Sequence, residues 1–207
     1  FEGEYLNGKR HGKGKEYEDD KIIFEGEYLN GEKWNGKGKE YDYNGELEFE
    51  GEYLNGKKNG KGKEYNFDGQ LIFEGEYING ERNGKGREYD YNGILKLEGQ
   101  YLNGKKWNVK GYDQNGTIIC ELINGNGKVK EYYYNGKLEF EGEYINGEKN
   151  GKGKEYDFNG KLEFEGEFLN GKRNGKGKEY YLDGHLKFKG EYLNGKRVFN
   201  KKLLDLI

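Results

Sequence analysis

Phe49-Glu50-Gly51-Glu52-Tyr53-Leu54-Asn55-Gly56-Lys57-Lys58-Asn59-Gly60-Lys61-Gly62-Lys63-Glu64-Tyr65 is the stretch that decides the fold, because most of the 207-residue chain repeats it. Copies begin near residues 1, 24, 49, 73, 97, 118, 140 and 164, and a partial ninth begins at 188. The position of Tyr53, which we call the tyrosine slot, recurs at intervals of 21 to 25 residues. A fixed period of this length is the signature of a repeat architecture.

The first half of each copy alternates between two kinds of side chain. Leu47, Phe49, Gly51 and Tyr53 alternate with glutamates. Period 2 with aromatic enrichment predicts a β-strand with one buried face. The second half, from Gly60 to Tyr65, predicts a second strand of the same hairpin.

The dipeptide Asp68-Gly69 predicts a two-residue type I′ turn between hairpin strands, since both residue types tolerate positive φ. This turn fixes the register. On one face it sets Asn66 against Leu71, Glu64 against Phe73, Gly62 against Gly75 and Gly60 against Tyr77. On the other face it sets Tyr65 against Ile72, Lys63 against Glu74 and Lys61 against Glu76. A slip by one residue would place lysines on the aromatic face.

Glycine inside a strand usually marks the close approach of another group. We expect the repeated glycines to make room for neighbouring Tyr and Phe rings. The stretch from Asn55 to Gly60 is predicted to be the longer loop of each repeat, and the extra Trp34 and Trp107 of two copies are predicted to be insertions in it.

Composition indicates a thin fold with a shallow core. Charged residues reach 36% and hydrophobic residues only 31%, but aromatics make up 16% and the net charge is −3. Disordered chains are usually poor in aromatics. The single Cys120 gives no support for a disulfide-stapled secreted scaffold, and we expect a cytoplasmic protein, with cytoskeletal or membrane association left open. Because the chain begins at Phe1 in mid-motif, we expect a fragment or a processed product.

The motif Gly51-Glu52-Tyr53-Leu54-Asn55-Gly56, followed by Gly60, Gly62 and Tyr65, resembles the MORN repeat (membrane occupation and recognition nexus). The resemblance runs over residues 1–197. It implies an all-β fold: an elongated, twisted, single-layer antiparallel sheet of tandem β-hairpins, a MORN-repeat solenoid. Residues 97–139 are degenerate, which indicates drift, a local bend or a specialised binding patch. Residues 198–207 are predicted to be a C-terminal cap, since solenoids need atypical ends.

The residues give no support for an enzyme. The chain has no serine, and Cys120 has no histidine in its own or a neighbouring repeat. The Gly-Lys-Gly-Lys runs lack the hydroxyl residue and the helix of a phosphate-binding loop. The repeated Glu-x-Glu pairs are a solvated face rather than one catalytic site. We expect no metal, no cofactor and no small-molecule substrate.

We therefore expect a non-enzymatic repeat scaffold that binds a protein or associates with itself, as a dimer or filament, through its sheet ends and an aromatic groove. The predicted groove is formed by Tyr28, Tyr53, Tyr77, Tyr101, Tyr144 and Phe168. A specialised patch is predicted at Trp34, Trp107, Tyr112, Ile118 and Cys120.

Other functions stay open on the sequence. Basic residues at the hairpin tips form a candidate site for anionic phospholipid, and MORN repeats have been associated with phospholipid binding. These residues are Lys9, Arg10, Lys57, Lys58, Lys105, Lys106, Lys172 and Arg173. Glu32, Glu81 and Glu148 interrupt this row, and no nucleic acid is expected, because such binders carry a clear positive excess. The resemblance also leaves open an accessory region of a larger enzyme or an antitoxin-like protein binder, and the aromatic rows leave open a carbohydrate binder.

Overall fold

The computed structural model describes residues 1–18, 20–133 and 135–199, and in these ranges every regular element is a β-strand. The chain divides into two compact units, Phe1–Lys105 and Lys106–Ile207. The predicted cap at residues 198–207 lies almost entirely outside the described residues.

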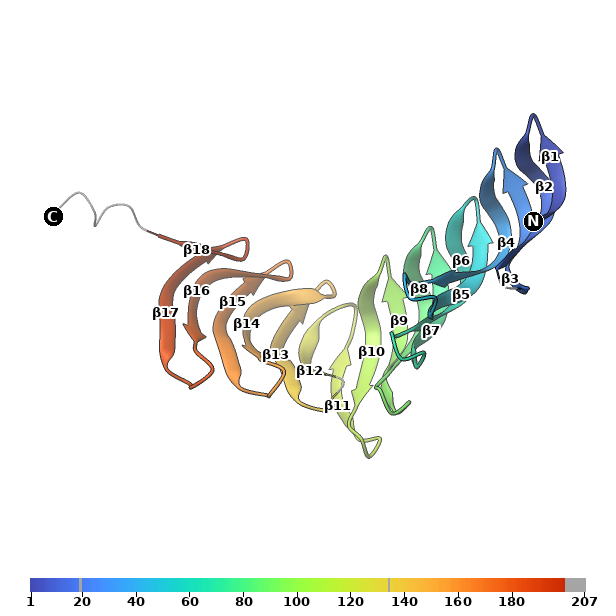
Figure 1. Cartoon of the computed structure of the whole chain (residues 1–207). Helices are drawn as coiled ribbons and strands as arrows, with labels where there is room; N and C mark the ends of the chain where they lie inside the picture. The colour runs from blue at the N-terminus through green and yellow to red at the C-terminus, as the bar shows by residue number, and fades with distance from the viewer. Residues whose placement is uncertain (19, 134, 200–207) are drawn as a thin grey trace. The chain divides into compact units, whose positions relative to one another are not determined.

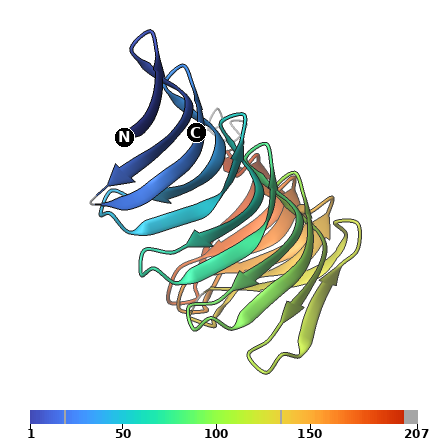
Figure 2. The same cartoon turned by 90° about the vertical axis from the view of Figure 1, so that its right-hand side faces the viewer.

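Unit 1 is a series of antiparallel strands that pair in chain order (Figure 1). The strands are β1 (Glu2–Leu6), β2 (Lys9–Glu18), β3 (Lys21–Leu29), β4 (Glu32–Tyr41), β5 (Leu47–Leu54), β6 (Lys57–Tyr65), β7 (Leu71–Ile78), β8 (Glu81–Tyr89) and β9 (Leu95–Leu102). Figure 2 shows that successive strands of this unit curve in the same sense.

Unit 2 continues the pattern. Its strands are β10 (Lys105–Tyr112), β11 (Ile118–Leu122), β12 (Gly127–Tyr132), β13 (Leu138–Ile145), β14 (Glu148–Tyr156), β15 (Leu162–Leu169), β16 (Lys172–Tyr180), β17 (Leu186–Leu193) and β18 (Lys196–Val198). β10 pairs with β11, and β12 to β18 form a seven-stranded sheet. Between β11 and β12 there is only the isolated bridge Ile123–Asn126 among the described residues. The all-β fold of tandem antiparallel hairpins is confirmed, but its strands are divided between two sheets.

The predicted register is confirmed along most of β6 and β7. Glu64 lies opposite Phe73, Gly62 opposite Gly75, Gly60 opposite Tyr77, Lys63 opposite Glu74 and Lys61 opposite Glu76. The predicted pairs at the turn are wrong, because a bulge places Tyr65 opposite Leu71 instead of Ile72. The extra residue of a bulge is left unpaired, and its strand bends there.

The two hairpin ends of each repeat have the opposite turn types to those predicted. Asn55 and Gly56 have φ values of 52° and 73°, so they form the two-residue type I′ turn, and Leu54 pairs directly with Lys57. At the other end the amide of Gly69 donates to the carbonyl of Asn66, and only Gly69 is in the left-handed region, with φ of 71°. This loop is therefore a type I turn closed by a glycine, with three residues instead of two.

The tryptophan insertions lie in strands rather than in loops. Trp34 is in β4, where Tyr28 pairs with Lys33 and Glu27 with Asn35, so the extra residue is accommodated as a bulge. Trp107 lies within β10. The backbone carbonyl of Trp34 accepts a hydrogen bond of 2.8 Å from Gly56 of the next repeat, and Trp107 accepts one of 2.7 Å from Gly125. Repeats without an insertion have the same bond, as from Gly80 to Lys58, so the insertions leave this link between consecutive hairpins intact.

The predicted role of the strand glycines is confirmed. A Cβ on Gly62 would lie 2.7 Å from Cε2 and Cζ of Phe49 and 3.0 Å from Cε2 of Tyr77. The ring of Phe49 is 1% exposed and meets Tyr77 of the next repeat edge-on, with centroids 5.4 Å apart. Each phenylalanine therefore packs on a glycine pair, and the edge-to-face contacts run from one repeat to the next.

The pair β10–β11 in the degenerate stretch has a different core from that of the intact repeats. Val109 lies opposite Leu122, where intact repeats have a glycine opposite a tyrosine, as with Gly36 and Tyr53. Val109 is 2% exposed and Leu122 is 1% exposed. A larger residue in the glycine slot thus compensates for a smaller one in the ring slot.

Candidate functional site

The rings predicted to line an open groove form the core of the fold. Tyr28, Tyr77, Tyr101, Tyr144 and Phe168 are 2 to 7% exposed, and Tyr53 is half-buried. The tyrosine hydroxyls donate to a row of glutamates, for example from Tyr53 to Glu40 at 2.6 Å and from Tyr144 to Glu131 at 3.0 Å. Partner binding on this face stays a prediction, but these rings offer a partner little surface.

Basic side chains cover the phenylalanine rings. The Lys58 Nζ lies 3.8 Å from the centroid of Phe49, and the Arg82 guanidinium carbon lies 3.8 Å from that of Phe73. The same arrangement recurs in unit 2 at Lys149, Arg173 and Arg197. Such cation–π contacts stabilise the fold by about 0.5–2 kcal/mol each. Basic side chains therefore cover the face of the sheet that carries the rings.

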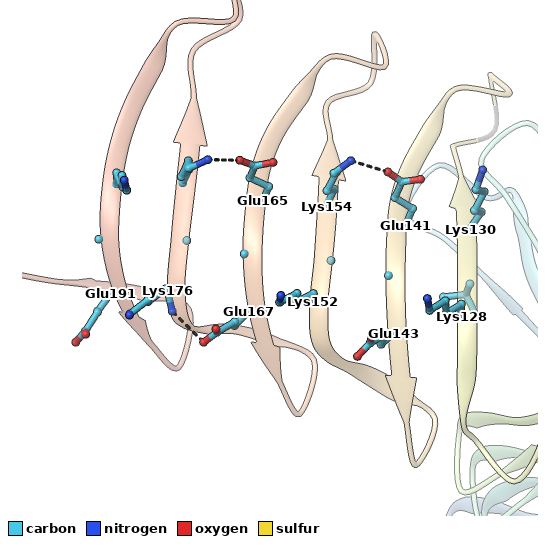
Figure 3. A pocket seen from close by; sticks show the side chains of 18 of the residues that line it. Lys128, Lys130, Glu141, Glu143, Lys152, Lys154, Glu165, Glu167, Lys176 and Glu191 are labelled. Atoms are coloured by element: carbon cyan, nitrogen blue, oxygen red, sulfur yellow. Dashed lines mark hydrogen bonds and ion pairs between the residues drawn. The ribbon is translucent and has the colours of Figure 1, made fainter.

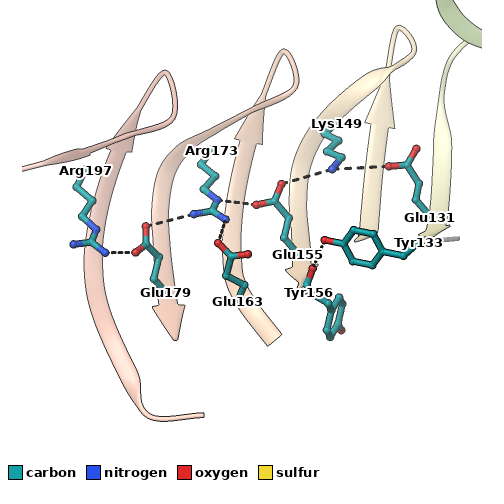
Figure 4. A network of polar contacts seen from close by, with 9 residues as sticks. All are labelled: Glu131, Tyr133, Lys149, Glu155, Tyr156, Glu163, Arg173, Glu179 and Arg197. Atoms are coloured by element: carbon teal, nitrogen blue, oxygen red, sulfur yellow. Dashed lines mark hydrogen bonds and ion pairs between the residues drawn. The ribbon is translucent and has the colours of Figure 1, made fainter. Parts of the chain in front are cut away.

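These cations alternate with glutamates in a continuous network in unit 2 (Figure 4). Arg173 bonds Glu155 at 2.7 Å and Glu179 at 3.4 Å, so it joins two hairpins, and Arg197 bonds Glu179 from the far side. Lys149 lies 3.6 Å from Glu155 and 3.9 Å from Glu131. The network shares each cation between carboxylates of neighbouring repeats and leaves it less available to an outside ligand.

The network sets the pKa values of its members. Burial alone would raise the pKa of Glu131, but Lys106, Lys149 and the Tyr144 hydroxyl outweigh it and lower this pKa below its ordinary value. At the other edge of the sheet, burial and a hydrogen bond to Glu141 raise the pKa of Tyr156 to about 12. These residues stabilise the fold in the ionisation states that they have near neutral pH.

Half of the predicted anion-binding tips are committed to internal ion pairs. Arg10 bonds Glu16 at 2.7 Å, Lys58 bonds Glu40 at 2.8 Å, Lys106 bonds Glu131 at 2.9 Å and Arg173 bonds Glu155 at 2.7 Å. The preceding residues Lys9, Lys57, Lys105 and Lys172 are exposed beside the type I′ turns. Whether these four bind anionic lipid stays a prediction.

The predicted specialised patch is brought together only in part. Tyr112 lies opposite Ile118, but Cys120 fills a core slot opposite Gly111 and is 9% exposed. Trp107 is half-buried in the same unit, whereas Trp34 belongs to unit 1. Ile118, at 51% exposed, is the patch residue that offers the largest exposed fraction to a partner.

The face opposite the rings in unit 2 carries a trough that sequence reasoning missed (Figure 3). Its volume is about 1060 Å³, and its floor is the glycine backbone at the centre of strands β13 to β17. Two rows of charged residues flank the floor. The paired row contains Lys130, Glu141, Lys154, Glu165, Lys178 and Lys189, and the clamp row contains Lys128, Glu143, Lys152, Glu167, Lys176 and Glu191. The repeated Lys-Gly-Lys and Glu-Gly-Glu triplets are the signal that could have predicted both rows.

An exposed row of aliphatic residues was also missed. The residue after each slot tyrosine, next to the type I′ turn, is Leu or Ile in every repeat. We call these residues the aliphatic edge: Leu6, Leu29, Leu54, Ile78 and Leu102 in unit 1, and Ile123, Ile145, Leu169 and Leu193 in unit 2. Apart from the half-buried Leu29, they are 40 to 62% exposed.

Two features are absent from the described part of the chain. No group of three or more His, Cys, Asp or Glu side chains there has a metal-binding arrangement. No helix there is long and apolar enough to cross a membrane.

Comparison with protein families assigns the repeats. The MORN repeat model matches residues 1–20, 49–70, 73–94 and 164–186, and a MORN repeat variant matches residues 34–55, 125–146 and 149–170. A search of curated proteins gives no match. The repeats make the chain a repeat scaffold, and this repeat is generally non-catalytic. With family matches over most of its length and tandem antiparallel hairpins throughout, the chain belongs to the MORN-repeat family.

Proposed function

We propose that this repeat scaffold binds another protein, or a second copy of itself, along the aliphatic edge. The observation that carries the proposal is the exposure of one Leu or Ile at the same place in successive repeats, such as Ile78 at 49% and Leu102 at 40% in unit 1. Single exposed apolar residues are ordinary, but a contiguous row of them marks an interaction surface.

The charges beside this edge favour a protein over a lipid surface. In unit 1 the residue paired with the aliphatic side chain alternates in sign, with Lys57 opposite Leu54 but Glu81 opposite Ile78. In unit 2 both signs also occur, with Glu148 opposite Ile145 but Lys172 opposite Leu169. An anionic membrane attracts clusters of lysine and arginine and gains nothing from interspersed glutamates. A protein partner can match both signs, and such complementarity contributes mainly to specificity.

The test is crosslinking of the intact chain in a lysate of its source, together with light scattering of the purified chain for self-association. In the test variant Leu54, Ile78 and Leu102 are replaced by Thr, which keeps strand propensity. Each lost buried CH₂ weakens an interface by about 0.8 kcal/mol, so we expect at least a tenfold loss of binding.

The control variant carries Tyr43→Thr and Phe67→Thr. These side chains are 91% and 76% exposed and lie in the three-residue loops at the other end of the hairpins. It should bind as the unaltered chain does. Equal loss in both variants, or no partner and no self-association at all, would refute the proposal; flotation with anionic vesicles that depends on Lys57 and Lys172 would favour the membrane alternative.

A further inference from the structure

The trough of unit 2 shares no lining residue with the aliphatic edge, and its two charged rows are not equivalent. In the paired row, Lys154 bonds Glu141 at 3.2 Å and Lys178 bonds Glu165 at 2.6 Å (Figure 3). These lysines have carboxylate partners on the neighbouring strand.

In the clamp row, glutamates turn toward the backbone instead. In the pair β15–β16 the register shifts between Gly166 and Phe168, so the bulge in β16 sets Asn174 to Lys176 opposite the single residue Glu167 and frees a backbone amide. Glu167 accepts a hydrogen bond of 3.1 Å from the amide of Lys176, and its Oε2 lies 2.1 Å from where a Cβ of Gly175 would be. Glu143 lies in the same way against Gly151, 2.2 Å from the corresponding position.

The lysines of the clamp row are consequently left without ion pairs. Lys128, Lys152 and Lys176 are exposed, and none of them has a carboxylate within ion-pair distance in the described part of unit 2. Seven lysines and five glutamates line the trough, so it carries a positive excess. Lys189 adds to this excess at one end, because it lies opposite Lys178 where the other repeats pair a lysine with a glutamate.

The spacing of these lysines selects a ligand. They lie on alternate strands, so they are about 9.6 Å apart. A peptide in the extended polyproline II conformation rises about 3.1 Å per residue with three residues per turn, so every third side chain points the same way, about 9.3 Å further along. The two rows are separated by two residues along a strand, about 6.7 Å between Cα atoms. An α-helix with its side chains is about 10–12 Å wide and is too broad to lie between them.

We infer that the trough binds an extended acidic peptide segment that runs across the strands and presents a carboxylate at about every third residue to Lys128, Lys152 and Lys176. The glycine floor lets the peptide backbone approach closely, and the side walls leave room for a single extended chain. This surface uses none of the residues of the aliphatic edge, so it goes beyond the function proposed above.

The probe is a fluorescent peptide of about ten residues with Glu at every third position and Ser elsewhere, titrated with the whole chain and followed by anisotropy. We expect binding that weakens with salt and that is lost when Gln replaces Glu in the peptide. The variant with Lys128→Gln, Lys152→Gln and Lys176→Gln should bind about tenfold more weakly, since an exposed ion pair contributes up to about 1 kcal/mol. Its circular dichroism should be unchanged, because these lysines make no internal ion pair.

The matched control replaces three exposed lysines of unit 2 outside the trough, Lys137, Lys172 and Lys196, by Gln. It should bind within twofold of the unaltered chain. A peptide with Pro among the spacers, which cannot be helical, should bind equally well.

Three results would overturn the inference: no binding of the acidic peptide, equal loss in both triple variants, or binding only of helical peptides. Salt-sensitive binding to phosphatidylserine vesicles that the trough variant abolishes, with the peptide unaffected, would reassign the trough to a lipid headgroup. If the trough variant loses the peptide but keeps the crosslinked partner, the inference stands independently of the aliphatic edge.

Discussion

Replacing Gly62 by Ala tests the packing on which every intact repeat depends. The new Cβ would lie 2.7 Å from two carbons of the Phe49 ring. That ring cannot withdraw, because it is 1% exposed, covered by Lys58 at 3.8 Å and held edge-on by Tyr77. The backbone at Gly62 is an ordinary strand without positive φ, so alanine meets only steric conflicts, with Phe49 and, at 3.0 Å, with Cε2 of Tyr77.

The two opposing effects differ in size. Losing the extra freedom of an unfolded glycine stabilises the fold by roughly 0.5–1 kcal/mol, whereas overpacking costs about 1–3 kcal/mol. We expect Gly62→Ala to lower the free energy of unfolding by about 1–2 kcal/mol. Phe49→Leu alone should cost about 1–2 kcal/mol, since it truncates a buried ring by less than a change to alanine does.

The double variant distinguishes a steric conflict from general damage. A shorter side chain at position 49 vacates space beside the new methyl group. A comparable exchange occurs in a neighbouring slot, where Val109 stands in place of the glycine opposite the tyrosine position and Leu122 in place of the tyrosine. The double variant should therefore be more stable than the sum of the single effects by about 1 kcal/mol or more. Urea denaturation followed by circular dichroism measures the cycle. Additivity within about 0.5 kcal/mol would refute this account of the strand glycines.

Three other predictions concern single positions. Asn79 has φ of 55°, so Asn79→Ala should cost about 1 kcal/mol in thermal unfolding, whereas Asn79→Gly should change stability by less than about 0.5 kcal/mol. The pKa of Glu131 is lowered from its ordinary value of 4.5. Ionised Glu131 therefore contributes to the free energy of unfolding above pH 4.5, and this contribution is lost as the pH falls through the lower pKa of the folded state. Glu131→Gln should flatten the acid side of a plot of stability against pH. The pKa of Tyr156 is raised from 10.0 to about 12. The neutral phenol therefore contributes to the free energy of unfolding in full below pH 10, and this contribution is lost as the pH rises toward 12. Tyr156→Phe should remove one late-ionising phenol from an ultraviolet titration and reduce the loss of stability at alkaline pH.

The strand register could be predicted because two independent patterns select it. Setting Lys61 against Glu76 on one face also sets Gly62 against Gly75 on the other, and a slip by one residue breaks both relations. The type of turn could not be predicted from the Asn-Gly and Asp-Gly dipeptides alone, since they occur at both hairpin ends. The distinguishing signal is Asn66, three residues before Gly69, whose side-chain oxygen accepts hydrogen bonds from Asp68 and Gln70. An Asn or Asp at the first position is typical of a type I turn.

The accessibility of the aromatic row could not be read from alternation, which says only that Phe49 and Tyr53 share a face. Its burial depends on Lys58, which the type I′ turn places opposite Tyr53 and whose Nζ lies over the Phe49 ring. Lys58 looks like a solvated tip residue in the sequence because its partner, Glu40, belongs to the preceding repeat. Contacts between repeats of this kind decide what is exposed, and a motif within one repeat does not contain them.

Contacts between repeats also determine which positions can give this chain selectivity for a partner. The ring, glycine and glutamate contacts link each repeat to its neighbour, so these positions cannot vary singly without a compensating change, as Val109 and Leu122 show together. The trough lysines and the aliphatic edge lack such links. Lys189 replaces the usual glutamate opposite Lys178 without any change in the ladder around it, since Gly177 and Gly190 keep their register. Positions free of contacts between repeats can therefore change charge at little cost in stability, and selectivity for a partner can arise there while the core stays the same.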